Sequence, residues 1–144
     1  MDFTIRFEPN ISAEDEKTIY EGLLAHNAED LSLPIDQIRT QRFAFVVRLN
    51  GRIVAGLIGC LKFTSAFIDT LWVERDLRKR GLGRQLVEQA EEYARSKSCG
   101  VIFLNTLTKA NVNFYENLGY VLEFERHGYM AGNTMRYFRK ELSR

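Results

Sequence analysis

The chain of 144 residues is 45% hydrophobic and 27% charged. These proportions are those of an ordinary globular protein, so they exclude a disordered chain, and ten glycines with two prolines exclude a collagen-like one. Twenty Lys and Arg residues against 19 Asp and Glu residues leave a net charge of +1, which gives no overall basic field to hold nucleic acid. One domain over residues 1–144 is expected, because a domain holds about 150 residues.

The longest apolar run, Ile53 to Leu61, is nine residues long. A helix that crosses a bilayer needs about 20, so no membrane span is expected. The first residues lack the cationic start and apolar core of a secretory signal. Cys60 and Cys99 have no CxxC spacing, so we expect neither a disulfide framework nor a metal site, and we expect a cytoplasmic location.

In the first part of the chain, apolar and polar residues alternate over residues 3–7, which predicts a strand. Ser12 followed by Asp15 is typical of a helix start, and the apolar spacing continues that helix to about Asn27. Pro34 is expected to open a short second helix.

The central part of the chain is rich in residues that favour strands. We expect strands at 43–49 and 52–63, joined by Asn50-Gly51, which is the strongest two-residue hairpin signal. A further strand is expected at 67–73. These three strands predict an antiparallel meander.

The last part alternates between the two kinds of element. Apolar residues recur at helical spacing over 83–97, and Gly119 is a suitable residue to end a helix at 111–118. Strands are expected at 101–104, 120–125 and 134–142. The element order predicts an α/β protein with a mixed, mostly antiparallel central sheet and helices on both faces.

A basic turn lies between the strand at 67–73 and the helix at 83–97. It runs from Arg78 to Arg84, and Gly81 and Gly83 allow its backbone N–H groups to point into one concavity at a helix N-terminus. Such a turn favours a phosphate or diphosphate. A solvated charge run is the plainer alternative. Leu86 stands where a dinucleotide fingerprint needs its third glycine, and no Gly-Lys-Ser/Thr is present for a P-loop.

Two sequence blocks resemble the GNAT superfamily of N-acetyltransferases. Segment 78–83 matches that family's Arg/Gln-x-x-Gly-x-Gly/Ala signature, and segment 71–74, Leu-Trp-Val-Glu, resembles its fourth strand. Segment 113–120, Asn-Phe-Tyr-Glu-Asn-Leu-Gly-Tyr, resembles its FYExLGY segment. The element order also fits over nearly the whole chain. The resemblance implies the GNAT acyltransferase fold and an acetyl-CoA-dependent N-acetyltransferase that needs no metal.

The resemblance also implies where acetyl-CoA binds. The family's usual Asn seven residues before the tyrosine is Thr108 in this chain, and its usual Ala four residues before it is Asn111, which makes Asn105 an alternative polar contact. The residues implied in cofactor binding are Leu71, Trp72, Val73, Arg78, Lys79, Arg80, Gly81, Leu82, Gly83, Arg84, Asn105 and Asn111.

Two residues are candidates for the chemistry. Tyr115 matches the family's general-acid tyrosine, and a phenol with a pKa of about 10 is protonated at neutral pH. A core aromatic is the alternative role. Asp69 is the candidate base, because a carboxylate within an otherwise apolar strand is unusual. A buried ion pair or a residue facing an open edge is the alternative for Asp69.

The acceptor is expected to be a primary amine of a small molecule or peptide. Residues 12–36 contain seven acidic residues and one lysine, and an acidic rim attracts a cationic amine, although a solvated helix face explains the same pattern. No nucleic acid or membrane partner is expected, and exposed edge strands make a homodimer plausible. A non-catalytic acyl-CoA-binding or regulatory module is the alternative function. The sequence does not name the amine.

Overall fold

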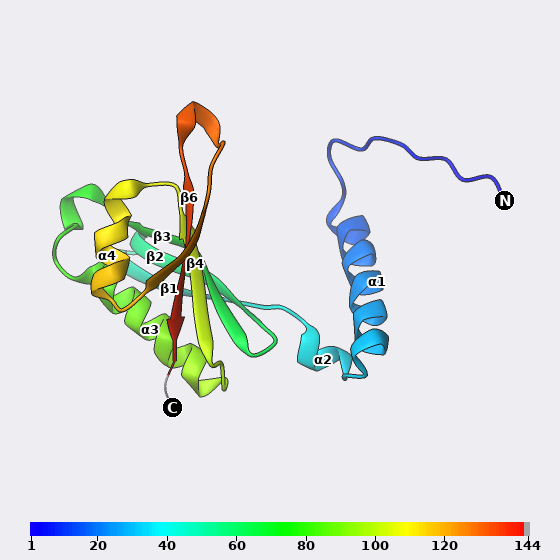
Figure 1. Ribbon diagram of the computed structural model, residues 1–144, viewed down its shortest axis with the longest axis horizontal. Coiled ribbons are helices and arrows are strands. Elements are labelled where there is room, and N and C mark those ends of the chain that lie inside the picture. The colour runs from blue at the N-terminus through cyan, green and yellow to red at the C-terminus, as the bar shows by residue number, and fades with distance from the viewer. Residues whose placement is uncertain (143–144) are drawn as a thin grey trace. The chain divides into compact units, whose positions relative to one another are not determined.

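The computed structural model describes residues 1–142, and the chain divides into two compact units, Met1–Arg39 and Thr40–Arg144 (Figure 1). No helix in the described part of the chain is both long and apolar enough to cross a membrane. The expectation of a single domain stays a prediction.

The first unit contains two helices, α1 (Ala13–Leu31) and α2 (Ile35–Ile38). The Ser12 side chain accepts a hydrogen bond of 3.0 Å from the Asp15 N–H, so the predicted cap of α1 is confirmed. The helix runs about one turn beyond the predicted end. Residues 1–8 have no regular secondary structure, so the strand predicted at 3–7 is wrong. Alternation alone cannot hold a strand, because its backbone groups need a neighbouring strand, and the first unit has none among its described residues.

The second unit is built on one six-stranded sheet. The strands lie in the order β1-β2-β3-β4-β6-β5, and only β3 and β4 are parallel neighbours. The strand bounds are β1 (Gln41–Leu49), β2 (Arg52–Lys62), β3 (Ser65–Val73), β4 (Val101–Thr106), β5 (Val121–Arg126) and β6 (Met135–Glu141). The predicted fold class is confirmed, because the sheet is mixed, mostly antiparallel and accompanied by helices.

The hairpin between β1 and β2 confirms its sequence signal. Asn50 and Gly51 both have positive φ, 51° and 79°. Only a turn of that kind matches the right-handed twist of the two strands, and Asn and Gly adopt it most easily. The hairpin therefore fixes which residues of β1 and β2 face the core.

Helix α3 (Leu82–Ser96) packs on the sheet (Figure 1). Its residues Leu86, Val87, Ala90 and Ala94 are buried in one cluster with residues of the strands. Helix α4 (Val112–Asn117) follows the short 3₁₀ turn η2 (Lys109–Asn111), and two other 3₁₀ turns lie at η1 (Arg75–Leu77) and η3 (Met130–Gly132). The core cluster thus joins α3, α4 and the sheet.

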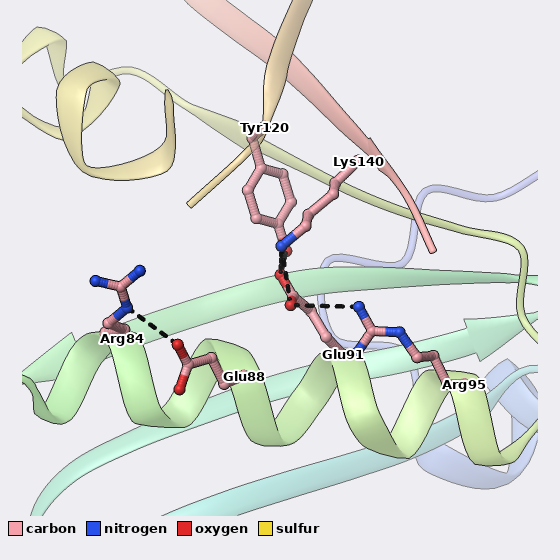
Figure 2. A network of polar contacts seen from close by, with 6 residues as sticks. All are labelled: Arg84, Glu88, Glu91, Arg95, Tyr120 and Lys140. Carbon is pink, nitrogen blue, oxygen red and sulfur yellow. Dashed lines mark hydrogen bonds and ion pairs between the residues drawn. The ribbon is translucent and has the colours of Figure 1, made fainter. Parts of the chain in front are cut away.

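A buried carboxylate ties α3 to the end of the chain (Figure 2). Glu91 is 4% exposed and accepts hydrogen bonds from the Tyr120 hydroxyl at 3.1 Å and from Lys140 Nζ at 2.9 Å. Burial, and then the charge of Glu91, raise the pKa of Tyr120. Since a buried charge is stable only when it is paired, this network fixes the position of α3 relative to β5 and β6.

Candidate active site

Strands β3 and β4 pair along only part of their length. Their parallel register runs from Ser65 opposite Val101 to Ile68 opposite Leu104, although β3 continues to Val73 and β4 to Thr106. Beyond Ile68 the two strands have no register with each other, so the sheet is open at its centre. This opening lies at the C-terminal ends of both strands.

Asp69 marks the point where the opening begins. Where β3 pairs with β2, Ile68 lies opposite Gly59 and Thr70 lies opposite Ile58. Asp69 has no partner in this register, so it is the extra residue of a β-bulge. A bulge bends its strand and redirects the side chain at that position. The bulge therefore turns β3 away from β4 immediately before segment 71–73.

The backbone of segment 71–73 faces the opening. The Glu74 N–H donates to the Val54 carbonyl at 2.9 Å, and strand backbone groups alternate in direction. The N–H groups of Leu71 and Val73 consequently point away from β2. The Val73 carbonyl accepts a 2.9 Å hydrogen bond from Arg78 Nε, while its N–H points into the opening.

A cavity of about 690 Å³, here called the cofactor cavity, runs from this opening to the basic turn. It is lined by most of the predicted site, namely Leu71, Trp72, Val73, Arg78, Lys79, Gly81, Leu82, Gly83, Arg84, Asn111 and Tyr115. Arg80 is exposed and does not line it. Asn105 and Asp69 also lie outside it.

Four residues of the cofactor cavity were not predicted as site residues: Leu77, Thr108, Ala110 and Phe114. Leu77 belongs to η1 and Ala110 to η2, and neither turn has a sequence signal of its own. Phe114 immediately precedes the predicted tyrosine. An aromatic at that position is most simply explained as core, so sequence reasoning missed it.

The basic turn has the backbone shape of an anion site. Lys79 and Gly81 have left-handed φ angles of 62° and 84°, and Gly81 caps α3 without any side-chain hydrogen bond. The first N–H groups of α3 are thereby left for a ligand. Arg84 forms a 3.0 Å ion pair with Glu88 on the helix surface (Figure 2). The backbone, more than the Arg84 side chain, therefore supplies the donors.

A second cavity of about 300 Å³, here called the acceptor cavity, meets the cofactor cavity. It contains the predicted Asp69 and Asn105, and it shares Leu71, Asn111 and Tyr115 with the cofactor cavity. The structure therefore brings both predicted catalytic residues to one cavity. The two cavities meet at the tyrosine.

Tyr115 is 7% exposed and is held by aromatic neighbours. Its ring centroid lies 5.0 Å from that of Phe114, 5.8 Å from Tyr120 and 6.1 Å from Phe138. Burial raises the pKa of Tyr115 above its ordinary value, so the phenol keeps its proton at neutral pH. Its hydroxyl makes no hydrogen bond to any other residue that the structure describes, which leaves the proton available to a ligand.

Asp69 is exposed to the acceptor cavity and forms no ion pair within residues 1–142. The alternative of a buried ion pair, left open by the sequence, does not describe it. Within the same residues, no group of three or more His, Cys, Asp or Glu side chains could hold a metal ion.

Comparison with known proteins gives a consistent result. Residues 9–120 match the family model described as "Acetyltransferase (GNAT) family". Blasticidin-S acetyltransferase of Streptomyces morookaense is 32% identical over 94 residues, which cover 65% of this chain and 69% of that protein.

Solved structures share the fold. A presumed acetyltransferase from Agrobacterium tumefaciens superposes with a TM-score of 0.83 at 22% identity, over 98% of this chain and 99% of the other. An aminoglycoside 6′-N-acetyltransferase complexed with coenzyme A gives a TM-score of 0.63 at 19% identity, over 72% of this chain and 74% of the other. At these identities the likeness shows the fold alone.

Proposed function

The chain belongs to the GNAT family of acetyltransferases, and we propose that it transfers an acetyl group from acetyl-CoA directly to a primary amine of a small molecule or peptide. The observation that carries this proposal is the meeting of two cavities at Tyr115, one leading to the basic turn and the other containing Asp69. A direct transfer needs both substrates next to one proton donor. Two cavities that meet at Tyr115 allow the thioester and the amine to lie beside the same phenol.

The cofactor cavity fits coenzyme A in three places. The uncapped start of α3 and the left-handed residues Lys79 and Gly81 suit a diphosphate. The N–H groups of Leu71 and Val73 suit an extended amide chain, which binds as a strand would. Tyr115 lines the cavity where it meets the acceptor cavity. Acetyl-CoA would supply the acetyl thioester there.

Three groups of the chain divide the chemistry. The Val73 N–H donates a hydrogen bond to the carbonyl oxygen as negative charge develops on it. Tyr115 donates its proton to the departing sulfur as the C–S bond breaks. The N–C bond forms on the side of the acceptor cavity, where the amine gives up a proton to Asp69, directly or through water.

Asp69 also bears on the protonation state of the acceptor amine. An amine with a pKa of about 10.4 is almost fully protonated at pH 7, and the ammonium ion cannot attack. A carboxylate at the cavity wall attracts that ammonium ion, and it accepts the proton of the nitrogen as the N–C bond forms. Blasticidin-S acetyltransferase acts, by its name, on an antibiotic, so amine-bearing antibiotics belong in the first acceptor screen together with polyamines and peptides.

The variant Tyr115→Phe tests the proposal. Release of coenzyme A with the best amine of the screen should fall by about 10²-fold, because the general acid is lost. The affinity for coenzyme A, measured by calorimetry, should stay within about twofold of wild type. Tyr93→Phe, on α3 outside the cavities described, is the matched control and should keep full turnover.

Two outcomes contradict the proposal. If coenzyme A gives no heat and no competition at millimolar concentration, the cofactor cavity is wrongly identified. If coenzyme A binds but no amine is acetylated, the chain is the non-catalytic acyl-CoA-binding module considered above. A cytoplasmic location stays a prediction, supported by the free thiols of Cys60 and Cys99.

A further inference from the structure

A third cavity, of about 390 Å³, lies beside the other two and is here called the basic cavity. It is lined by Leu107, Thr108, Lys109, Gly132, Asn133, Thr134 and Arg136. Leu107 also lines the acceptor cavity, and Thr108 also lines the cofactor cavity. The loop after β4 is therefore a wall common to all three cavities.

The β4–β6 register fixes how close the basic cavity is to the acceptor cavity. Arg136 pairs with Thr106, and Thr106 lines the acceptor cavity. Paired strands lie about 4.8 Å apart. Met135 lines the acceptor cavity while its neighbours Thr134 and Arg136 line the basic one, as expected when side chains alternate along a strand.

The charged residues of the basic cavity are both cations. The Arg136 side chain is 18% exposed. Among residues 1–142 its guanidinium group makes only long polar contacts, 3.4 Å from Nε to Glu125 and 3.4 Å from Nη1 to the Thr134 carbonyl. Lys109 is exposed, and its side chain forms no hydrogen bond or ion pair with any residue of the described chain. Because Glu125 offsets only one of the two charges, the cavity keeps a net positive charge.

We propose that the basic cavity binds an anionic group of the acceptor, a carboxylate or a phosphate, while the acceptor's amine lies at Asp69. This inference rests on the proposed function and narrows its substrate class to amines that carry an anionic group, such as amino acids and amino sugar phosphates. A guanidinium group binds carboxylate and phosphate oxygens in pairs, and a nearby ammonium group adds a point charge.

The opposite charges of the two cavities make this class distinguishable from polyamines. Asp69 attracts an ammonium group, whereas Lys109 and Arg136 repel a second one. The acidic segment 12–36 by itself favours cationic amines, and polyamines belong to that class. The basic cavity favours zwitterionic acceptors over them.

The test compares amines that differ by one anionic group: cadaverine with lysine, tyramine with tyrosine, and glucosamine with glucosamine 6-phosphate. The anionic member of at least one pair should have a kcat/KM about 10-fold to 100-fold higher than its partner. This ratio corresponds to the free energy of one hydrogen bond to a charged group. In Lys109→Gln and in Arg136→Gln this ratio should fall by about 10-fold, because the KM of the anionic amine rises. Lys62→Gln and Arg42→Gln, exposed on β2 and β1, should keep the ratio.

A binding measurement separates failure of this inference from failure of the proposed function. Amide shifts in the NMR spectrum are recorded while glucosamine 6-phosphate is added to the protein with coenzyme A present. Shifts at 107–109 and 132–136 that are absent with glucosamine and lost in Lys109→Gln support the site even if no amine is acetylated. The Lys109 side chain has no hydrogen-bond or ion-pair partner among the described residues, so this variant should fold even if Arg136→Gln, which loses the contact with Glu125, does not.

Three results overturn the inference. The first is acetylation of amines with an equal kcat/KM within every pair. The second is a preference for polyamines that Lys109→Gln leaves unchanged. The third is a raised KM for acetyl-CoA in Lys109→Gln with the acceptor KM unaltered, which would assign the cavity to the cofactor.

Discussion

The position of Asp69 follows from one extra residue in β3. The bulge exposes its carboxylate to the acceptor cavity, whereas a regular strand would have continued its pairing with β4. An exposed acid that forms no ion pair within residues 1–142 is free to accept a proton from an amine, and this role makes a prediction about pH.

Asp69→Asn should lower kcat/KM for the amine by about 10²-fold at pH 7. Without the base, the reaction depends on amine that is already neutral, and that fraction rises about 10-fold for each pH unit below the amine's pKa. The loss should therefore shrink between pH 7 and pH 9. Asp76→Asn, in η1 outside the cavities, is the control. A loss that is constant across this range would make Asp69 a structural residue.

Tyr120 should make the fold sensitive to alkaline pH. Burial raises its pKa, so the folded chain holds the phenol proton at pH values where the unfolded chain releases it. The free energy of unfolding must then fall as pH rises above about 10, the pKa of an unfolded tyrosine. Tyr115, whose pKa is also raised by burial, adds to this slope.

In Tyr120→Phe, urea unfolding should show a smaller loss of stability between pH 8 and pH 10.5 than in wild type. At pH 8 the variant itself should be about 1–3 kcal/mol less stable, because Glu91 loses a donor. Tyr93→Phe should keep the wild-type slope. An unchanged slope in Tyr120→Phe would assign the alkaline loss to other groups.

At the scale of elements, Gly59 sets how closely β1, β2 and β3 pack. A Cβ at this position would lie 2.6 Å from Phe43 Cζ and 2.7 Å from the Phe67 carbonyl oxygen. The ring can move, but the carbonyl belongs to the paired backbone of β3. Gly59 is therefore required by the sheet and not by a turn.

Gly59→Ala should destabilise the protein by about 3 kcal/mol, as overpacking does. The matched control is Gly22→Ala in the middle of α1, where a Cβ would meet nothing within 4 Å. That change should raise stability by about 0.5–1 kcal/mol. Thermal unfolding of both variants measures the difference, and a Gly59→Ala variant as stable as wild type would contradict the packing argument.

Local signals predicted the elements well, and long-range pairing explains what they missed. Ser12, the Asn50-Gly51 turn and the apolar face of α3 each act through neighbours in sequence, so their elements were predictable. The bulge at Asp69 depends on register with β2, which sequence alone does not give. The strand expected at 3–7 is absent, because alternation of apolar and polar residues does not show whether a neighbouring strand is available to pair with.

The site was predictable where it lies in one continuous segment. The basic turn and segment 71–73 line the cofactor cavity as a block. Arg80 departs from that block because it is exposed at the bend of the turn, and Phe114 was missed because an aromatic there reads as core. Gly83 has a second reason to be glycine, since a Cβ would lie 3.3 Å from the Phe114 ring where α3 meets α4.

For the molecule as a whole, the small net charge is the sum of an acidic N-terminal segment and a basic remainder. Residues 1–39 hold nine acidic and three basic residues, a charge of −6, whereas residues 40–144 hold ten acidic and 17 basic residues, a charge of +7. The three cavities are formed by the basic part. A polyanion such as coenzyme A is therefore attracted to it before contact.

The KM for acetyl-CoA should rise by about 3-fold to 10-fold when salt is raised from about 0.05 M to 0.5 M, because screening shortens the reach of these charges. The control is 3′-dephospho-acetyl-CoA, which carries less charge and should show a weaker dependence. Equal dependence for the two compounds would mean that the 3′-phosphate does not contribute to the attraction.

The early end of the β3–β4 register has a thermodynamic consequence. Because backbone pairing on either side holds the gap apart, its shape exists before any ligand arrives, and little conformational entropy is lost on binding. Coenzyme A should therefore associate in a single kinetic phase whose rate grows linearly with concentration, without the plateau that a preceding isomerisation imposes.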